Sequence, residues 1–285
     1  MTLPSIQSKQ GTIGLIELDL APKLASLIGL NLELQENVAV IEKLLTSMGE
    51  ISSHHLTGLI VDPIYSFAVT KKKGQAGVLT RLTILQDETD PLAVPSLFPN
   101  YGLEEMRNNY NMAALELFYH PQEDNALKKK QLLAEIYDYC DYLDIHLLLK
   151  IIAYTPAGQE PSQENFQKSQ LQAIQEICRT ADVVALQYPL DPLAAATITA
   201  ELDIPWVLSS QGQSYEEYKQ ELRVSLENGA TGFCIGTPLW RELKNMKLED
   251  KSPDLEKINQ FIETTFKDRL IELMRISTEI VKNNS

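Results

Sequence analysis

The chain alternates between short continuous apolar runs and longer stretches whose apolar residues recur at helical spacing. Apolar runs bounded by turn residues are typical of strands that are buried on both faces. The pattern predicts eight such strands: Gly11–Asp19, Leu56–Pro63, Gly77–Leu85, Met112–His120, Asp144–Pro156, Ala181–Leu190, Ile204–Gly212 and Gly229–Trp240.

Helical periodicity fills most of the intervals between these strands. The predicted helices are Leu32–Met48, Leu103–Tyr110, Asn125–Leu143, Ser162–Thr180, Pro192–Leu202, Tyr215–Asn228 and Pro253–Val281, while Gln86–Pro99 is predicted to be a surface loop.

Eight strands alternating with helices within 285 residues predict an α/β protein with a single-domain (β/α)8 barrel, the TIM barrel. We expect residues 1–10 to be an N-terminal tail and residues 11–285 to be the barrel, ending in an extended helix. A doubly wound open sheet is the alternative. No G-x-G-x-x-G motif follows the first strand, which argues against that alternative and against a dinucleotide cofactor.

The net charge of −14 argues against sequence-independent nucleic-acid binding, which requires a basic surface. The three cysteines lack metal-ligand spacing, and their sparse number is typical of a reducing compartment. The chain shows no signal peptide and no apolar run long enough to insert into a membrane. The sequence therefore predicts a cytoplasmic protein without a metal or other cofactor.

In a (β/α)8 barrel, the functional site lies at the C-terminal ends of the strands. The polar residues near those predicted ends are the candidates for the site. They are Asp19, Asp62, Glu116, Tyr119, His120, Lys150, Tyr154, Gln187, Ser209, Ser210, Gly212 and Gly236.

Lys150 is the sharpest candidate because it is the single charge in the middle of an apolar run. Burying a lysine is costly unless it is paired or its lowered pKa is used. One interpretation is a Schiff-base lysine with a depressed pKa. The other is an ion pair inside the barrel with Glu116 or Asp62.

The segments Ser209–Ser214 and Ile235–Trp240 place glycine and small residues just before helix starts, where backbone N–H groups can hold a phosphate. Tight turns without a ligand are the alternative. The basic run Lys71–Gly74 is either a solvated loop or a second anion-binding loop.

Five segments resemble the class I tagatose-bisphosphate aldolase family: Thr57–Phe67, Ala113–Asp124, Asp144–Pro156, Ala181–Leu190 and Gly232–Trp240. The resemblance implies a (β/α)8 barrel that cleaves ketose bisphosphates through a lysine imine, without a metal.

The chain departs from the family pattern at the positions that carry the family's catalytic residues. The imine lysine of the sixth strand aligns with Ala185, and the fifth-strand glutamate aligns with Lys150. The fourth-strand lysine aligns with Leu115 or, after a slip of one residue, with Glu116. If Leu115 faced the barrel interior, alternation would turn Glu116 toward the helices, so an inward Glu116 implies a slip or a bulge.

The phosphate-binding part of the family pattern is also altered. Asp19 is kept, but the arginine behind it aligns with Ala21. The eighth-strand phosphate arginine aligns with Thr237, although Arg241 lies four residues further on and is a substitute candidate.

These losses favour a non-catalytic relative that acts as a binding or assembly module. The alternative is an aldolase or related lyase on a phosphorylated sugar with Lys150 as a relocated imine former, for which Glu116, Asp62 and Asp19 are the further catalytic candidates. A third hypothesis is acid–base chemistry by Glu116, His120 and Tyr154.

A phosphorylated small molecule and a protein partner are the expected kinds of ligand, and homo-oligomer formation stays open. The last helix and the segment Gln86–Pro99 are the places where we would expect a partner protein.

Overall fold

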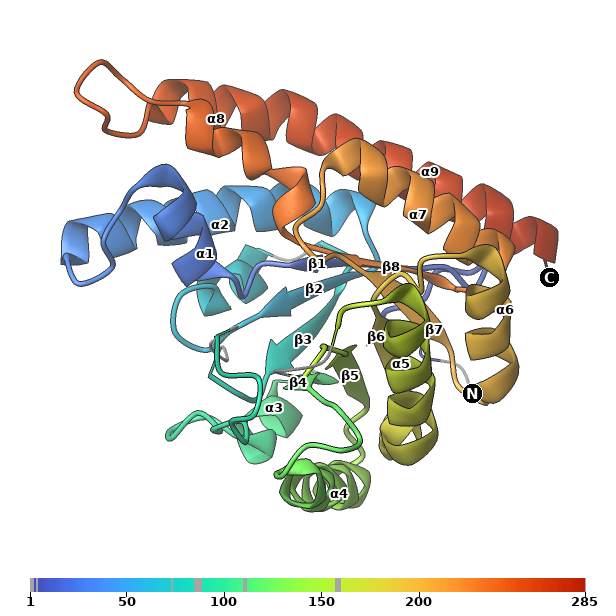
Figure 1. The fold of residues 1–285 in the computed structure, drawn as a ribbon. Coiled ribbons are helices and arrows are strands. Elements are labelled where there is room, and N and C mark those ends of the chain that lie inside the picture. The colour runs from blue at the N-terminus through green and yellow to red at the C-terminus, as the bar shows by residue number, and fades with distance from the viewer. Residues whose placement is uncertain are drawn as a thin grey trace.

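The computed structural model describes residues 3, 5–72, 74–84, 89–109, 112–156 and 160–284. Eight parallel strands form a closed barrel in sequence order, with the last strand paired to the first (Figure 1). The strands are β1 (Ile13–Glu17), β2 (Gly58–Val61), β3 (Gly77–Arg81), β4 (Met112–Phe118), β5 (Leu147–Ile152), β6 (Val183–Leu186), β7 (Trp206–Ser209) and β8 (Gly232–Ile235). The predicted (β/α)8 barrel is confirmed.

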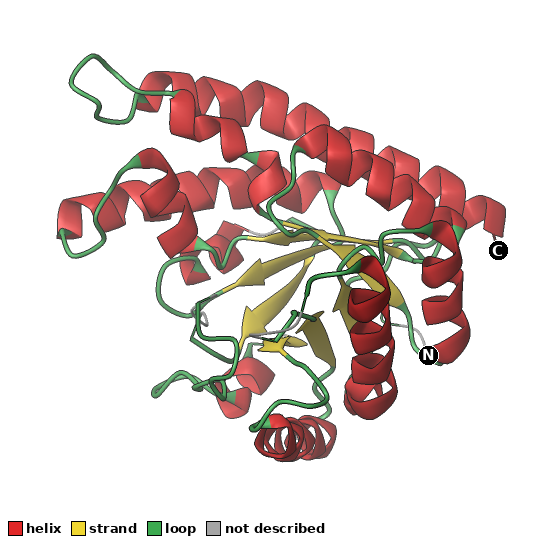
Figure 2. Ribbon diagram, in the orientation of Figure 1, coloured by secondary structure: helices red, strands yellow, loops and turns green. Residues whose placement is uncertain are grey.

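Helices surround the barrel on its outside (Figure 2). They are α1 (Ala21–Ile28), α2 (Gln35–His55), α3 (Leu103–Asn108), α4 (Ala126–Leu143), α5 (Gln163–Ile177), α6 (Pro192–Glu201), α7 (Tyr215–Glu227), α8 (Leu255–Phe261) and α9 (Lys267–Asn284).

Helix α2 continues to His55, past the predicted end at Met48, and two further helical regions differ from the sequence prediction. The short helix α1 was not predicted; it contains a proline in its first turn and ends at Gly29, whose φ of 83° is left-handed. The predicted last helix is instead α8 and α9, joined by the π-helical segment Ile262–Phe266. The apolar face of α9 packs against α7 and α2 (Figure 1).

Side-chain caps fix where several helices begin. Ser162, Asp191 and Asp254 each accept a hydrogen bond from a backbone N–H in the first turn of α5, α6 and α8. Ser214 and Glu217 form a reciprocal capping box at the start of α7.

The N-terminal segment closes the end of the barrel at which the strands begin. Leu3 and Ile6 are fully buried, and they belong to the same apolar cluster as Leu15 and Leu79 of the barrel interior. The close fit requires a glycine at the start of β3, since a Cβ on Gly77 would lie 2.1 Å from the carbonyl oxygen of Ser5.

Alternation along β4 settles which side chains face the barrel interior. Ala114 belongs to the interior cluster, whereas Leu115 packs in the outer cluster beneath the helices. Because the pairing of β4 with β5 runs without interruption, Glu116 faces inward without a bulge. Glu116 pairs in register with Lys150, and Lys150 with Ala185.

Parts of two predicted loops lie outside the described residues, namely Lys73 in the basic run and residues 86–88 in the acidic, proline-bearing segment. None of the helices described is both long and apolar enough to cross a membrane.

Candidate functional site

Lys150 lies between two carboxylates inside the barrel, near the end at which the strands finish, which we call the mouth. Its Nζ is 2.9 Å from Oε2 of Glu116 on the neighbouring strand β4, and it donates a hydrogen bond to Oε1 of Glu17 on β1. The exposed fractions of the three side chains are 9% for Lys150, 4% for Glu17 and 12% for Glu116. We call these three residues the ion triad.

The two carboxylates determine the protonation of Lys150. Burial by itself lowers the pKa of the Lys150 amine, but the charges of Glu116 and Glu17 outweigh burial and hold the pKa well above its ordinary value. Burial raises the pKa of Glu116, yet the Lys150 charge brings it below its usual value. At neutral pH the amine is therefore an ammonium without a free electron pair, which a nucleophile needs.

A second ion pair lies beside the ion triad. Arg81 of β3 is 3.2 Å from Asp19, which follows β1, and both side chains are 6% exposed. Burial raises the pKa of Asp19 to about 7, although the Arg81 charge opposes this rise. Within the described residues, Oδ1 of Asp19 and Nε of Arg81 have no hydrogen-bond partner.

Glu17 and Arg81 are site residues that the sequence analysis missed. Both carry the signal that identified Lys150, because each is a charged residue inside an apolar run, in GLIEL and VLTRL. Each lies near the end of its run, where a charge is easily taken for the end of the strand.

The ion triad forms the floor of a cavity at the barrel mouth with a volume of about 260 Å³. Its wall combines strand ends with the loops after β7 and β8 and with the start of α1. The lining residues are Glu17, Leu20, Lys23, Glu116, Phe118, Lys150, Ile152, Ser210, Gln211, Gly212 and Thr237.

The loops after β7 and β8 are held together at the rim of this cavity. The N–H of Gly236 donates to Oγ of Ser210 at 3.1 Å, and the guanidinium of Arg241 donates to the carbonyl of Gly212 at 3.0 Å. A Cβ on Gly236 would lie 2.7 Å from Cδ1 of Leu20 and 2.8 Å from Oε2 of Glu17, so a larger residue there would displace one of these side chains. Gly212 has a left-handed φ of 80°.

Asp62 lies apart from the mouth and stabilises the turn after β2. Its Oδ1 accepts hydrogen bonds from the N–H groups of Ile64 and Tyr65, and its Oδ2 accepts one from the hydroxyl of Ser66. Asp62 is 1% exposed and is not among the residues that line the cavity. Its expected place beside Lys150 is corrected: the backbone donors of its own turn hold the carboxylate there.

Tyr119 and His120 also lie outside the mouth, contrary to expectation. Phe118 lines the cavity, so alternation turns Tyr119 outward, where its hydroxyl donates to Oε2 of Glu176 on α5 at 2.5 Å. Nε2 of His120 lies 3.2 Å from the hydroxyl of Ser169, also on α5.

Tyr154 belongs to the same outer layer. Its hydroxyl donates to Oε2 of Glu123, whose Oε1 is 2.8 Å from Nζ of the fully buried Lys129. Lys129 also donates to the carbonyl oxygens of Pro91 and Phe118, each at 2.7 Å. Acid–base chemistry that combines Glu116 with His120 and Tyr154 is therefore not supported by their placement.

Gln187 and Ser209 lie next to the mouth without lining it. Oε1 of Gln187 accepts the N–H of Ala153 at 2.7 Å, and Gln187 lines a neighbouring hollow of about 310 Å³ together with Gln211. Ser209 is fully buried. In the part of the chain that the structure describes, no group of three His, Cys, Asp or Glu residues is arranged to hold a metal ion.

The fold resembles aldolases of known structure, whereas no family model and no curated protein matches the sequence. An archaeal fructose-1,6-bisphosphate aldolase, with its catalytic lysine covalently bound to the carbinolamine intermediate, has a TM-score of 0.59 and 15% identity over 96% of each chain. The fructose-bisphosphate aldolase of Slackia heliotrinireducens has a TM-score of 0.61 and 12% identity, covering 97% of this chain and 87% of its own. A protein from Corynebacterium glutamicum has a TM-score of 0.64 and 11% identity, covering 98% of this chain and 88% of its own.

At these identities the likeness extends to the fold alone. The chain therefore has an aldolase-like TIM barrel, and the narrower resemblance to the tagatose-bisphosphate aldolase family stays a prediction.

Proposed function

We propose that the protein binds a small phosphorylated, hydroxyl-bearing metabolite at the barrel mouth and does not form an imine with it. The observation that carries this proposal is the ion triad. Its lysine is held as an ammonium by Glu17 and Glu116, and Ala185 occupies the register position beside it, where the family resemblance implies the imine lysine.

The chemistry of the cavity supports the class of ligand. Carboxylates such as Glu17 and Glu116 accept hydrogen bonds from hydroxyl groups, and the Lys150 ammonium donates them. Lys23 also lines the cavity, and Arg241 adds a guanidinium at the rim beside Gly212. Two cations near a glycine-containing rim favour a phosphate group, and the volume of about 260 Å³ restricts the ligand to the size of a metabolite.

An aldolase in which Lys150 is the relocated imine former is the weaker candidate. Imine formation requires the neutral amine, and both neighbouring carboxylates stabilise the charged form. The ligand would have to displace Glu17 and Glu116 from the amine before any attack on a carbonyl.

Borohydride trapping tests the absence of an imine. The purified protein is incubated with dihydroxyacetone phosphate or fructose 1,6-bisphosphate and sodium borohydride, and its mass is measured intact and after digestion. We expect no added mass on any lysine, while a class I aldolase treated in parallel acquires the adduct. An adduct on Lys150, or steady cleavage of the ketose bisphosphate, would overturn the proposal.

Calorimetry with the same two phosphorylated probes and a panel of pentose and hexose phosphates tests the binding. We expect Arg241→Gln to weaken binding about tenfold, equivalent to ~1.4 kcal/mol. The control is Arg275→Gln on α9, which removes an exposed guanidinium paired with Glu279 and should leave the affinity unchanged. Absence of binding across the panel, or equal effects of the two variants, would contradict a phosphate site at this rim.

A further inference from the structure

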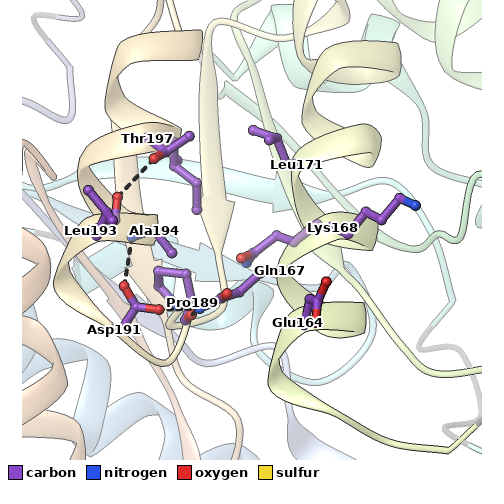
Figure 3. A pocket seen from close by; sticks show the side chains of 11 residues that line it. Glu164, Gln167, Lys168, Leu171, Pro189, Asp191, Leu193, Ala194 and Thr197 are labelled. Carbon is purple, nitrogen blue, oxygen red and sulfur yellow. Dashed lines mark hydrogen bonds between the residues drawn. The ribbon is translucent and has the colours of Figure 1, made fainter.

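A groove lies on the outside of the barrel between helices α5 and α6 and shares no lining residue with the cavity at the mouth (Figure 3). Its volume is about 370 Å³. Apolar side chains and methyl groups from both helices line much of it, including Leu171, Leu193, Ala194, Thr197 and Ile198.

Helix α6 presents apolar residues to the solvent as well as to the barrel. It carries no charged residue from Pro192 to Ala200, although Ala195 and Ile198 already supply its buried face. Leu193 is 77% exposed and stands at the edge of the groove. A helix that is apolar all round is normally covered on all sides.

The polar groups of the groove near the start of α6 already have hydrogen-bond partners. The side-chain amide of Gln167 donates to the carbonyl of Pro189 at 2.7 Å and to the carboxylate of Asp191. Asp191 also caps α6 by accepting the N–H of Ala194 at 2.9 Å (Figure 3). The groove is thus preformed, and what it offers a partner is chiefly apolar surface.

The α5 edge of the groove carries one acid and one base. Glu164 and Lys168 are one helical turn apart, and both are exposed. Among the described residues neither side chain forms an ion pair. In Figure 3 the Lys168 side chain extends from α5 in the direction away from α6.

We propose that this α5–α6 face binds a second copy of the chain across a two-fold axis. Leu193 of each copy enters the groove of the other copy, and Glu164 of each copy pairs with Lys168 of the other. A two-fold contact requires a surface that complements itself. An exposed leucine beside an apolar groove, with one acid and one base along its edge, meets that requirement.

Charge complementarity favours a second copy at this face. The net charge of −14 makes two copies repel each other through most of their surface. On the α5–α6 face, α6 carries no charge from Pro192 to Ala200, and the Asp191 carboxylate before it is already held by Gln167 and by the N–H of Ala194. Glu164 and Lys168 on α5 remain as one acid and one base that a two-fold axis can pair across the contact. The proposal is independent of what the barrel mouth binds.

Sedimentation velocity over the micromolar range tests the contact. We expect a concentration-dependent dimer of the wild type, and we expect Leu193→Asp to weaken dimerisation more than tenfold. The matched control is Leu127→Asp on α4, which changes a leucine that is 64% exposed elsewhere and should leave the dimer intact. Circular dichroism checks that both variants are folded.

Charge reversal tests the two-fold pairing. Glu164→Lys and Lys168→Glu should each weaken the homodimer, because either change opposes like charges twice across the axis. The double variant should restore the homodimer, and an equimolar mixture of the two single variants should form the mixed dimer in native mass spectrometry. A monomeric wild type, equal effects of Leu193→Asp and Leu127→Asp, or single reversals without effect would overturn the proposal.

Discussion

Replacing Lys150 by methionine removes the only positive charge of the ion triad and leaves Glu17 and Glu116 facing each other. The two carboxylates are 4% and 12% exposed, so water would solvate them poorly in place of the ammonium. Removing one partner of a buried ion pair costs about 3–5 kcal/mol in unfolding free energy. At 2–4 °C per kcal/mol, this loss lowers the melting temperature by about 10 °C.

The cost should depend on pH in a direction that identifies its cause. Without the ammonium, burial and the nearby Glu17 carboxylate raise the pKa of Glu116 in the folded variant above its unfolded value. The folded variant then binds more protons than the unfolded chain, so its stability rises as the pH falls. We therefore expect Lys150→Met to be less destabilising near pH 5 than near pH 8.

Thermal unfolding of wild type and variant, followed by circular dichroism at both pH values, measures this difference. Lys128→Met on α4 is the control, because its side chain is exposed and its loss should change stability by less than about 0.5 kcal/mol. A Lys150→Met variant that loses less than about 1 kcal/mol, equally at both pH values, would refute the buried ion triad.

Three further predictions concern other parts of the barrel. Asp19→Asn should flatten the pH dependence of stability between about pH 4 and 7. Because burial raises the pKa of Asp19 to about 7, the wild type loses stability as the pH rises through that range, whereas the variant should not; melting curves of both proteins measure the difference. Gly236→Ala should destabilise by about 1–3 kcal/mol and weaken ligand binding, because its Cβ would lie 2.7 Å from Cδ1 of Leu20 and 2.8 Å from Oε2 of Glu17. Gly212→Ala has open space around its Cβ but a φ of 80°, so it should cost only about 1–2 kcal/mol; denaturant unfolding and calorimetry separate the two variants. Ile6→Ala should cost about 2–5 kcal/mol in denaturant unfolding, because Ile6 is fully buried at the end of the barrel at which the strands begin, and a loss below about 1 kcal/mol would show that the N-terminal segment does not contribute to the core.

The fold was predictable from the sequence because parallel strands that are buried on both faces have uninterrupted apolar sequences. The helix α1 was missed because its eight residues form a segment too short to be identified as a helix by periodicity alone. The π-helical segment in the last helix could not be foreseen, since π-turns have no simple periodic signature.

The candidate site was predictable only in part. Lys150 is conspicuous in the middle of its run, and Glu116 follows once the alternation along β4 is fixed by pairing with β5. Tyr119 was placed at the mouth because it lies near a strand end, although alternation turns it toward α5. The groove beside Leu193 depends on how α5 and α6 pack, which no local pattern records.

The burial of Leu3 and Ile6 at the start of the strands affects the electrostatics of the ion triad at the opposite end of the barrel. A dry interior has a low dielectric constant, which strengthens the attraction between Lys150 and its two carboxylates. Removing or displacing the first few residues would admit water at the start of the strands and weaken that attraction without changing any of the three side chains. We therefore expect two hydrophobic side chains at the other end of the barrel to influence the protonation of the ion triad.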